Sequence, residues 1–236
     1  MSEAFDPDRT IVKKSIRGSA RVSADATVIA DATVLAGQGD MLALPVGTRI
    51  GDVEILKLIG VGGSGIVYLA QDHSQDRQVA LKEYFPPSIA SRRAGLSVSA
   101  RFEQHAEVLA AGLRSFIDRA QMLAQIDHPS LVKVHRFWEA GGTAFMVMPH
   151  YEGPTLAQAL LDLGSAPSEA WIEGVLGPLL EAVQLLHQKN YVHRDISPDN
   201  IILVNSGQPV LLDSGAAHRV IGALTRTPTL LVRPGF

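Results

Sequence analysis

The sequence contains no cysteine, which excludes disulfide bonds and metal sites built from thiolates. It lacks any apolar run that approaches the ~18 residues of a membrane-spanning helix, and residues 1–20 lack the apolar core of a signal peptide. A formal net charge of −3 without a long basic run argues against nucleic acid as a main partner. These absences favour a cytoplasmic protein with no membrane span and no nucleic-acid partner.

The chain divides by composition into a tail and a larger remainder. Residues 1–45 are rich in Ala, Ser, Asp and Thr and have few large apolar side chains, which predicts a flexible N-terminal tail. The whole chain of 236 residues is 46% hydrophobic, so it can bury one large core or two small ones.

The tail repeats a short pattern in which an aspartate stands two residues before Thr10, Thr27 and Thr33 and aliphatic residues follow. Phosphate would add about −1.5 to −2 charge to such a threonine, so one interpretation is a set of sites for a phosphothreonine-binding domain. Chance recurrence in an Ala/Thr-rich linker is the plain alternative. Near-duplicate six-residue units also occur in hexapeptide β-helices, which need at least three stacked repeats.

The stretch with the most chemistry is residues 191–202, which reads Y-V-H-R-D-I-S-P-D-N-I-I. Asp195 and Asn200 stand five residues apart in it, and Asp213 follows thirteen residues after Asn200. Phosphoryl transfer needs a carboxylate to orient the attacking hydroxyl and oxygen ligands to hold Mg²⁺ against the phosphates. These three residues supply that set. The structural alternative is a polar surface loop with an Asx turn.

A glycine-rich segment precedes this stretch. Gly60, Gly62 and Gly65 follow a strand candidate at residues 53–58 in the pattern G-x-G-x-x-G. That pattern also opens dinucleotide-binding folds, where a helix follows the glycines. Here residues 66–70 are β-branched and aromatic, which predicts a second strand and a hairpin that brings backbone N–H groups close to phosphates. The sequence V-A-L-K then ends at Lys82, a candidate phosphate ligand.

Together these motifs resemble those of bacterial serine/threonine protein kinases of the eukaryotic-like type, over about residues 47–236. The resemblance implies an α+β, bilobal protein-kinase-like fold. Its small lobe, residues 46–149, would hold an antiparallel sheet plus a helix. Its partial large lobe, residues 150–236, would be mostly helical. The helices that normally follow a turn like that at residues 234–236 are missing, so we expect an incomplete large lobe, truncated within the activation segment, and weak or no activity for this chain.

The resemblance also implies the cofactors ATP and Mg²⁺, a protein substrate, and specific site residues. Asp195 would be the catalytic base, and Asn200 and Asp213 would be the Mg²⁺ ligands. Met148 would line the back of the adenine pocket, before a hinge that offers a carbonyl and an N–H group. The implied nucleotide-binding positions are Gly60, Gly62, Gly65, Val67, Ala80, Lys82, Met148, Pro149, Tyr151 and Ile202.

Three positions depart from the family pattern. Arg119 stands where a helical glutamate normally pairs with the strand lysine, Ser214 replaces a phenylalanine, and Ser197 replaces a lysine that meets the γ-phosphate. Arg233 could supply the charge that Ser197 lacks, or it could be a solvated side chain. A pseudokinase or nucleotide-binding scaffold is therefore the alternative to an active enzyme. Aminoglycoside-type small-molecule kinases are a distant third, because they usually lack this glycine pattern and the arginine before the aspartate.

Apolar periodicity and capping residues predict the helices. We expect helices at residues 103–111 and 113–126, one that begins after Thr155, and one that begins after Ser168. The last should carry a buried stripe and should kink or restart near Pro178. Its predicted stripe consists of Ile172, Val175, Leu176, Leu179, Leu180, Val183 and Leu186.

Overall fold

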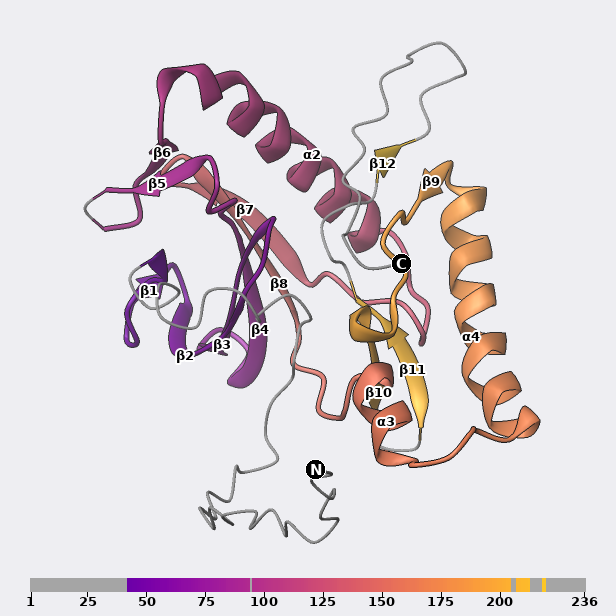
Figure 1. The fold of residues 1–236 in the computed structure, drawn as a ribbon. Coiled ribbons are helices and arrows are strands. Elements are labelled where there is room, and N and C mark those ends of the chain that lie inside the picture. Colours follow the sequence, from indigo (N-terminus) through magenta and orange to yellow (C-terminus); the bar gives the residue numbers. More distant parts are fainter. Residues whose placement is uncertain (1–41, 94, 205–206, 213–217, 220–236) are drawn as a thin grey trace, which may run out of the picture.

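The computed structural model describes residues 42–93, 95–204, 207–212 and 218–219. Figure 1 shows two parts, a sheet with the long helix α2 and a second part that holds α3, α4 and short strands. This arrangement confirms the predicted bilobal α+β fold. The sites predicted at Thr10, Thr27, Thr33, Asp213, Ser214 and Arg233 lie outside the described residues.

The first part is built on a six-stranded antiparallel sheet with the order β1-β2-β3-β4-β8-β7. Its strands are β1 Arg49–Ile50, β2 Val53–Val61, β3 Gly65–Asp72, β4 Arg77–Tyr84, β7 Arg136–Ala140 and β8 Thr143–Pro149. β2 and β3 pair on either side of the glycine-rich segment, so the predicted strand–glycine–strand hairpin is confirmed. β8 is almost wholly buried, which fits its run of apolar residues.

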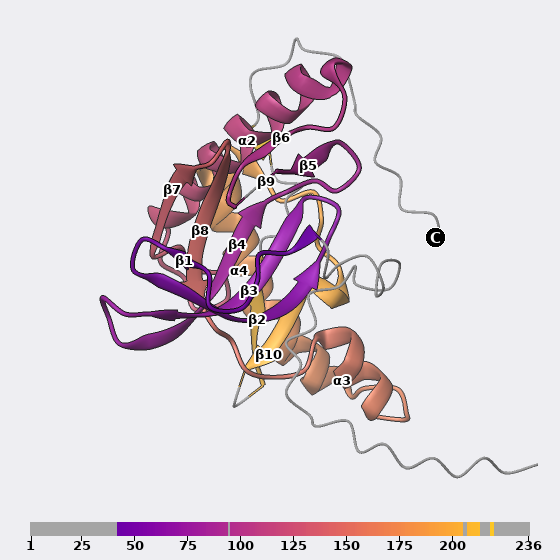
Figure 2. The same ribbon diagram turned by 90° about the vertical axis from the view of Figure 1, so that its left-hand side faces the viewer.

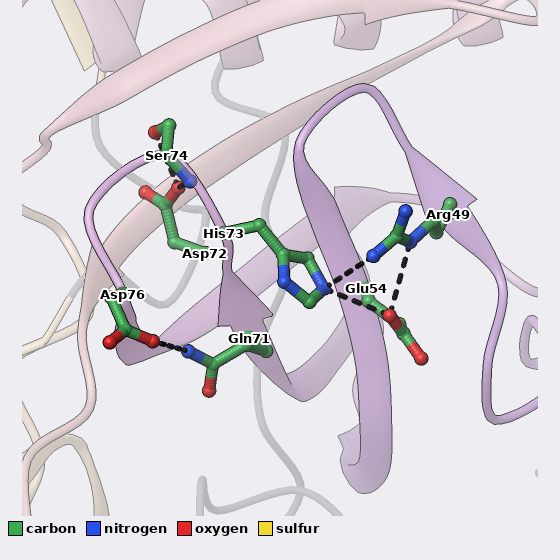
Figure 3. A network of polar contacts seen from close by, with 7 residues as sticks. All are labelled: Arg49, Glu54, Gln71, Asp72, His73, Ser74 and Asp76. Carbon is green, nitrogen blue, oxygen red and sulfur yellow. Dashed lines mark hydrogen bonds and ion pairs between the residues drawn. The ribbon is translucent and has the colours of Figure 1, made fainter.

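Two polar clusters stabilise the end of this sheet near the turn between β3 and β4 (Figure 3). Glu54 Oε2 lies 3.1 Å from Arg49 Nε and 2.8 Å from His73 Nε2. Nearby, the buried Asp72 carboxylate accepts hydrogen bonds from the backbone N–H and hydroxyl of Ser74, at 3.0 and 2.6 Å. It also accepts a hydrogen bond of 2.9 Å from Arg136 Nη2 on β7, which ties the turn to the far side of the sheet.

A small hairpin lies between β4 and α2, formed by β5 Ala90–Arg92 and β6 Val98–Ala100 and followed by the 3₁₀ turn η1 Glu103–His105. It packs against the β7–β8 turn at the end of the sheet (Figure 2). The Val98 N–H donates to the Gly141 carbonyl at 2.7 Å, and a Cβ on Gly142 would lie 2.5 Å from the Val98 oxygen. Gly141 and Gly142 also have φ of 63° and 79°, so this turn requires glycine twice over.

One helix, α2 Ala106–Ala124, runs along β7 and β8. The expectation of helical structure over residues 103–111 and 113–126 is largely confirmed, but the break expected between the two helices is wrong. Gly112 lies in the interior of α2, where a Cβ would stand 2.0 Å from the Tyr84 hydroxyl oxygen. Glycine at this position allows the helix to approach β4 closely, and does not end the helix.

The second part begins with α3 Leu156–Asp162 and α4 Glu169–Gln188. Both predicted caps are confirmed, because the Thr155 and Ser168 hydroxyls accept the N–H groups of Gln158 and Trp171 at 3.1 and 3.3 Å. The predicted restart at Pro178 is wrong, since α4 is continuous through it. Its buried face, formed by Val175, Leu179, Ala182 and Leu186, includes residues on both sides of the proline and packs both halves of the helix onto one core.

The predicted stripe was only partly correct. Ile172, Leu176 and Leu180 succeed one another every four residues on a neighbouring line of α4, and they are 39%, 48% and 66% exposed. Among the described helices, none is long and apolar enough to cross a membrane.

Short strands complete the second part. β10 Ile201–Val204 pairs with β11 Gln208–Leu211, and β9 Tyr191–Val192 pairs with β12 His218–Arg219. The 3₁₀ turn η2 Pro198–Asn200 stands directly before β10. The β11 residue Leu211 forms a parallel bridge with Leu131, which leads into the sheet. These short strands therefore place residues 193–200 beside the sheet.

Candidate active site

A cavity that opens to solvent lies between the sheet and the β10–β11 hairpin. Its lining residues are Ile59, Val67, Ala80, Lys82, Val132, Met148, Pro149, His150, Tyr151, Ile202 and Leu212. Every predicted nucleotide position that carries a side chain is among them. The lining is mostly apolar, with Lys82 and His150 as the basic groups, which suits a flat aromatic ring with a charged tail.

Four lining residues were missed by sequence reasoning. His150 stands between two predicted hinge residues, and Leu212 directly precedes Asp213, so both could have been found by position. Ile59 directly precedes the predicted nucleotide-binding residue Gly60, so its position in the sequence could also have identified it. Val132 had none, because only tertiary packing brings the chain after α2 to the cavity.

The glycine-rich hairpin closes on itself in a tight turn. The Gly62 N–H donates to the Gly65 carbonyl at 2.8 Å. A Cβ on Gly65 would lie 2.1 Å from the Glu83 carbonyl oxygen, so packing against β4 requires glycine there. A Cβ on Gly62 would meet nothing closer than 3.8 Å, and one on Gly63 nothing within 4 Å. Packing does not explain these last two glycines, whereas close approach of a phosphate to the backbone would.

Lys82 lies on β4, opposite Val67 of β3 in the sheet register. Its side chain is only 5% exposed and lines the cavity together with Ala80, two residues earlier on the same face of the strand. A buried lysine on a rigid central strand presents a cation at a defined place, as binding of phosphate oxygens requires.

The hinge, residues 149–151, begins at the last residue of β8. On this strand Met148 pairs with Ala80, and Pro149 pairs with Val79. The Tyr151 hydroxyl accepts a hydrogen bond of 3.4 Å from the Lys133 N–H, which ties the hinge to the segment before β7. Burial raises the pKa of the Tyr151 phenol, so this group stays neutral near pH 7. Pro149 offers a carbonyl but no N–H group, so any donor to a ligand here must come from another residue.

Hydrogen bonds hold the loop that carries Asp195. Asn200 is 1% exposed, and its Nδ2 donates to the Asp195 carbonyl at 2.9 Å. The Leu212 N–H donates to the Asn200 carbonyl at 2.8 Å, and His193 Nε2 lies 3.0 Å from the Leu212 carbonyl oxygen. Arg194, which lies between His193 and Asp195 in the chain, has a positive φ of 64°. The loop is therefore fixed on both sides of Asp195, and it is bonded to the residue directly before Asp213.

Asn200, the predicted metal ligand that lies within the described residues, suits Mg²⁺, which does not need a dedicated protein cage. Among the described residues, no group of three or more His, Cys, Asp and Glu could hold a metal ion. Mg²⁺ keeps several waters and is usually held by one or two protein ligands plus substrate phosphates. Because Asn200 uses its amide nitrogen toward Asp195, its amide oxygen is the atom it can offer to such an ion.

Two of the departures from the family pattern, Arg119 and Ser197, are within the described residues. Arg119 is 4% exposed on the inner face of α2, and its guanidinium carbon lies 5.9 Å from the Phe116 ring centroid. Burial raises the pKa of the Tyr84 phenol on β4, and the nearby Arg119 charge offsets part of that rise. Asp118, the nearest acid in sequence, is exposed. Thus α2 presents a buried cation where the resemblance places a carboxylate.

Residues 53–231 match the protein kinase domain family, so the chain belongs to the protein kinases. The proteins that it resembles in sequence include bacterial serine/threonine-protein kinases. It is 32% identical over 181 residues to PknD of Chlamydia trachomatis serovar D, a match that covers 70% of this chain and 17% of PknD. It is 32% identical over 189 residues to PrkC of Bacillus subtilis, covering 79% of this chain and 26% of PrkC.

Solved structures agree with this assignment. The structure described as the PpkA-294 apo form is 46% identical with a TM-score of 0.68, covering 73% of this chain and 61% of that one. The kinase domain of Mycobacterium tuberculosis PknI, at 22% identity and a TM-score of 0.58, shares the fold. The chain spans about a fifth of the length of its curated relatives. The resemblance inferred from the sequence motifs is confirmed at the level of family and fold.

Proposed function

We propose that this domain binds Mg–ATP in the cavity between the sheet and the catalytic loop and transfers the γ-phosphate to serine or threonine hydroxyls of a protein. The observation that carries the proposal is one cavity lined by Lys82, the hinge and Leu212, whose N–H is bonded to Asn200 in the loop that holds Asp195. An adenine ring would lie between Ala80 and Ile202, with its tail toward Lys82. A cytoplasmic location of the domain belongs to the same proposal, because ATP is available there.

In this proposal each residue has a simple task. The Asp195 carboxylate orients the substrate hydroxyl and accepts its proton, and the bond from Asn200 to the Asp195 backbone carbonyl keeps the loop in place. Lys82 holds the α- and β-phosphates, and the backbone of the glycine-rich hairpin excludes water above them. Mg²⁺, held by Asn200 and Asp213, would neutralise charge that develops between the phosphates.

A nucleotide-binding scaffold with little phosphotransfer is the second candidate, and buried Arg119 is the observation that favours it. In an active kinase a carboxylate from this helix holds the lysine in place. A cation there cannot do so, although the adenine cavity would still be formed.

The test is to measure both steps on the full-length protein, because this chain alone is expected to transfer phosphate weakly or not at all. Calorimetric titration with Mg–ATP reports binding, and label transfer from γ-labelled ATP to a mixed protein substrate reports phosphotransfer. Asp195→Asn is the control for transfer, and Lys82→Ala is the control for binding. Binding together with transfer that Asp195→Asn abolishes supports the kinase, whereas binding without transfer supports the scaffold. No binding at millimolar Mg–ATP by a folded sample would refute both.

A phosphothreonine-binding domain as partner of the tail is also part of the proposal, motivated by the repeated pattern at Thr10, Thr27 and Thr33. Mass-spectrometric mapping of sites after incubation with Mg–ATP tests it. An unmodified tail in a sample that phosphorylates other residues would remove its support.

A further inference from the structure

On the face of β4 opposite the cavity, the carboxylate of Glu83 is completely buried and accepts hydrogen bonds at both oxygens. Arg92 Nη2 donates to Glu83 Oε1 at 2.9 Å and to Oε2 at 2.7 Å. The Tyr68 hydroxyl donates to Oε2 at 2.8 Å. Burial and the neighbouring Glu83 charge raise the pKa of Tyr68, which keeps the phenol protonated as this bond requires.

Arg92 and Tyr68 carry this contact to two further segments. Arg92 belongs to β5, and its Nε donates to the Leu42 carbonyl at 2.7 Å. The Leu44 N–H donates to the Tyr68 hydroxyl at 3.0 Å. Together, Tyr68, Glu83, Arg92 and the backbone of Leu42 and Leu44 form what we call the Glu83 network. It joins β3, β4, the β5–β6 hairpin and the segment that leads into β1.

The network holds the same stretch of sheet that forms the cavity. Tyr68 follows Val67, and Glu83 follows Lys82. Successive side chains of a strand point to opposite faces, so Val67 and Lys82 line the cavity while Tyr68 and Glu83 are buried on the opposite face of the sheet. The Glu83 carbonyl oxygen is also the atom against which Gly65 packs. The strand positions that carry Lys82 and support the glycine-rich hairpin are thus held from the opposite face of the sheet by one buried carboxylate.

A stability argument alone does not explain this arrangement. Two buried charges lose their hydration, and replacing such a pair by apolar groups of similar size is often neutral or stabilising. What the pair provides is direction, since Arg92 bonds both Glu83 oxygens through Nη2 and the Leu42 carbonyl through Nε, which together favour one alignment of the β5–β6 hairpin against β4.

We propose that Arg92 is a positioning residue for the nucleotide site. Through Glu83 it fixes the β4 backbone, so that Lys82 and the glycine-rich hairpin are held in the geometry that binds the phosphates. The proposal rests on the proposed function only in taking Mg–ATP as the ligand.

The first experiment compares nucleotide affinity of the full chain with two substitutions in the hairpin. Arg92→Lys keeps the charge but cannot bond both Glu83 and Leu42, and it should weaken Mg–ATP binding by about three- to tenfold. Arg93→Lys changes the exposed neighbour and should leave the affinity unaltered. Affinity is measured by calorimetry well below the unfolding temperature of each variant.

The second experiment separates positioning from stability. In the double variant Glu83→Gln with Arg92→Met, the buried charges are removed while the amide oxygen still accepts the Tyr68 hydroxyl. Its unfolding midpoint should stay closer to the original than that of Arg92→Met alone, because neither buried charge is left unpaired. Its Mg–ATP affinity should fall like that of Arg92→Lys. Original affinity in a double variant with a normal midpoint would overturn the proposal.

A third measurement needs no nucleotide and therefore distinguishes failure of this inference from failure of the proposed function. Amide hydrogen exchange of the ligand-free chain should accelerate at residues 62–67 and 81–85 in Arg92→Lys and remain unchanged in Arg93→Lys. If exchange in both segments matches that of the original chain, the network does not position the site, whether or not ATP binds.

Discussion

Replacing Gly65 by alanine should destabilise the fold through one backbone contact. The new Cβ would lie 2.1 Å from the Glu83 carbonyl oxygen and 3.2 Å from its carbonyl carbon. The first distance is more than 1 Å short of ordinary van der Waals contact. The obstructing atoms are backbone atoms of the paired strand β4, so no side-chain rotation can relieve the clash, and the two strands must separate locally.

Such overpacking typically costs about 1–3 kcal/mol, and here the upper half of that range is expected because a central strand pair cannot relax outward. The assay is urea unfolding followed by circular dichroism, with the slope of the transition checked to be unchanged. Gly65→Ala should lower the urea midpoint. Gly63→Ala should change the free energy of unfolding by less than about 1 kcal/mol, since nothing lies within 4 Å of its Cβ.

Gly62→Ala tests the other role of these glycines. Its Cβ finds space within the protein, so stability should be kept while Mg–ATP binding weakens. Equal midpoints for Gly65→Ala and Gly63→Ala would refute the reasoning, because the two variants differ chiefly in the contact with Glu83.

Three further predictions concern other parts of the molecule. Arg119→Glu should increase label transfer from ATP, because it restores a carboxylate to the inner face of α2; an unchanged or lower rate in a folded variant would contradict this. Although burial raises the pKa of Asp72, its hydrogen bonds with Ser74 and the Arg136 charge leave that pKa below its ordinary value. Its stabilising effect should therefore be complete above about pH 4 and lost as pH falls through the folded-state pKa, so urea midpoints of the original and Asp72→Asn should converge below about pH 4. Parallel midpoints down to pH 3 would argue against it. Thr155→Ala removes the cap of α3 and should cost about 1 kcal/mol in the same unfolding assay, with Thr155→Ser as the rescuing control.

The features that the sequence alone determined depend on contiguous residues. The strand–glycine–strand hairpin follows from β-branched residues on both sides of the glycines, and the caps at Thr155 and Ser168 follow from one hydroxyl and an N–H three residues on. The spacing of Asp195 and Asn200 likewise encloses a short loop that closes on itself. These motifs were sufficient to predict the family and the fold. They also named most of the residues that line the cavity, and the roles of those residues stay predictions.

Tertiary structure alone decided the features that depend on distant residues. Gly112 looked like a helix boundary, but the Tyr84 ring on β4 makes it the point where α2 approaches the sheet. Pro178 looked like a break, but one buried face packs both halves of α4 onto the same core and the helix continues through the proline. Glu83 carried no signal, because its partners Tyr68 and Arg92 lie on other strands. In each case, contacts between elements outweigh a local preference of about 1–3 kcal/mol, and local sequence patterns do not encode such contacts.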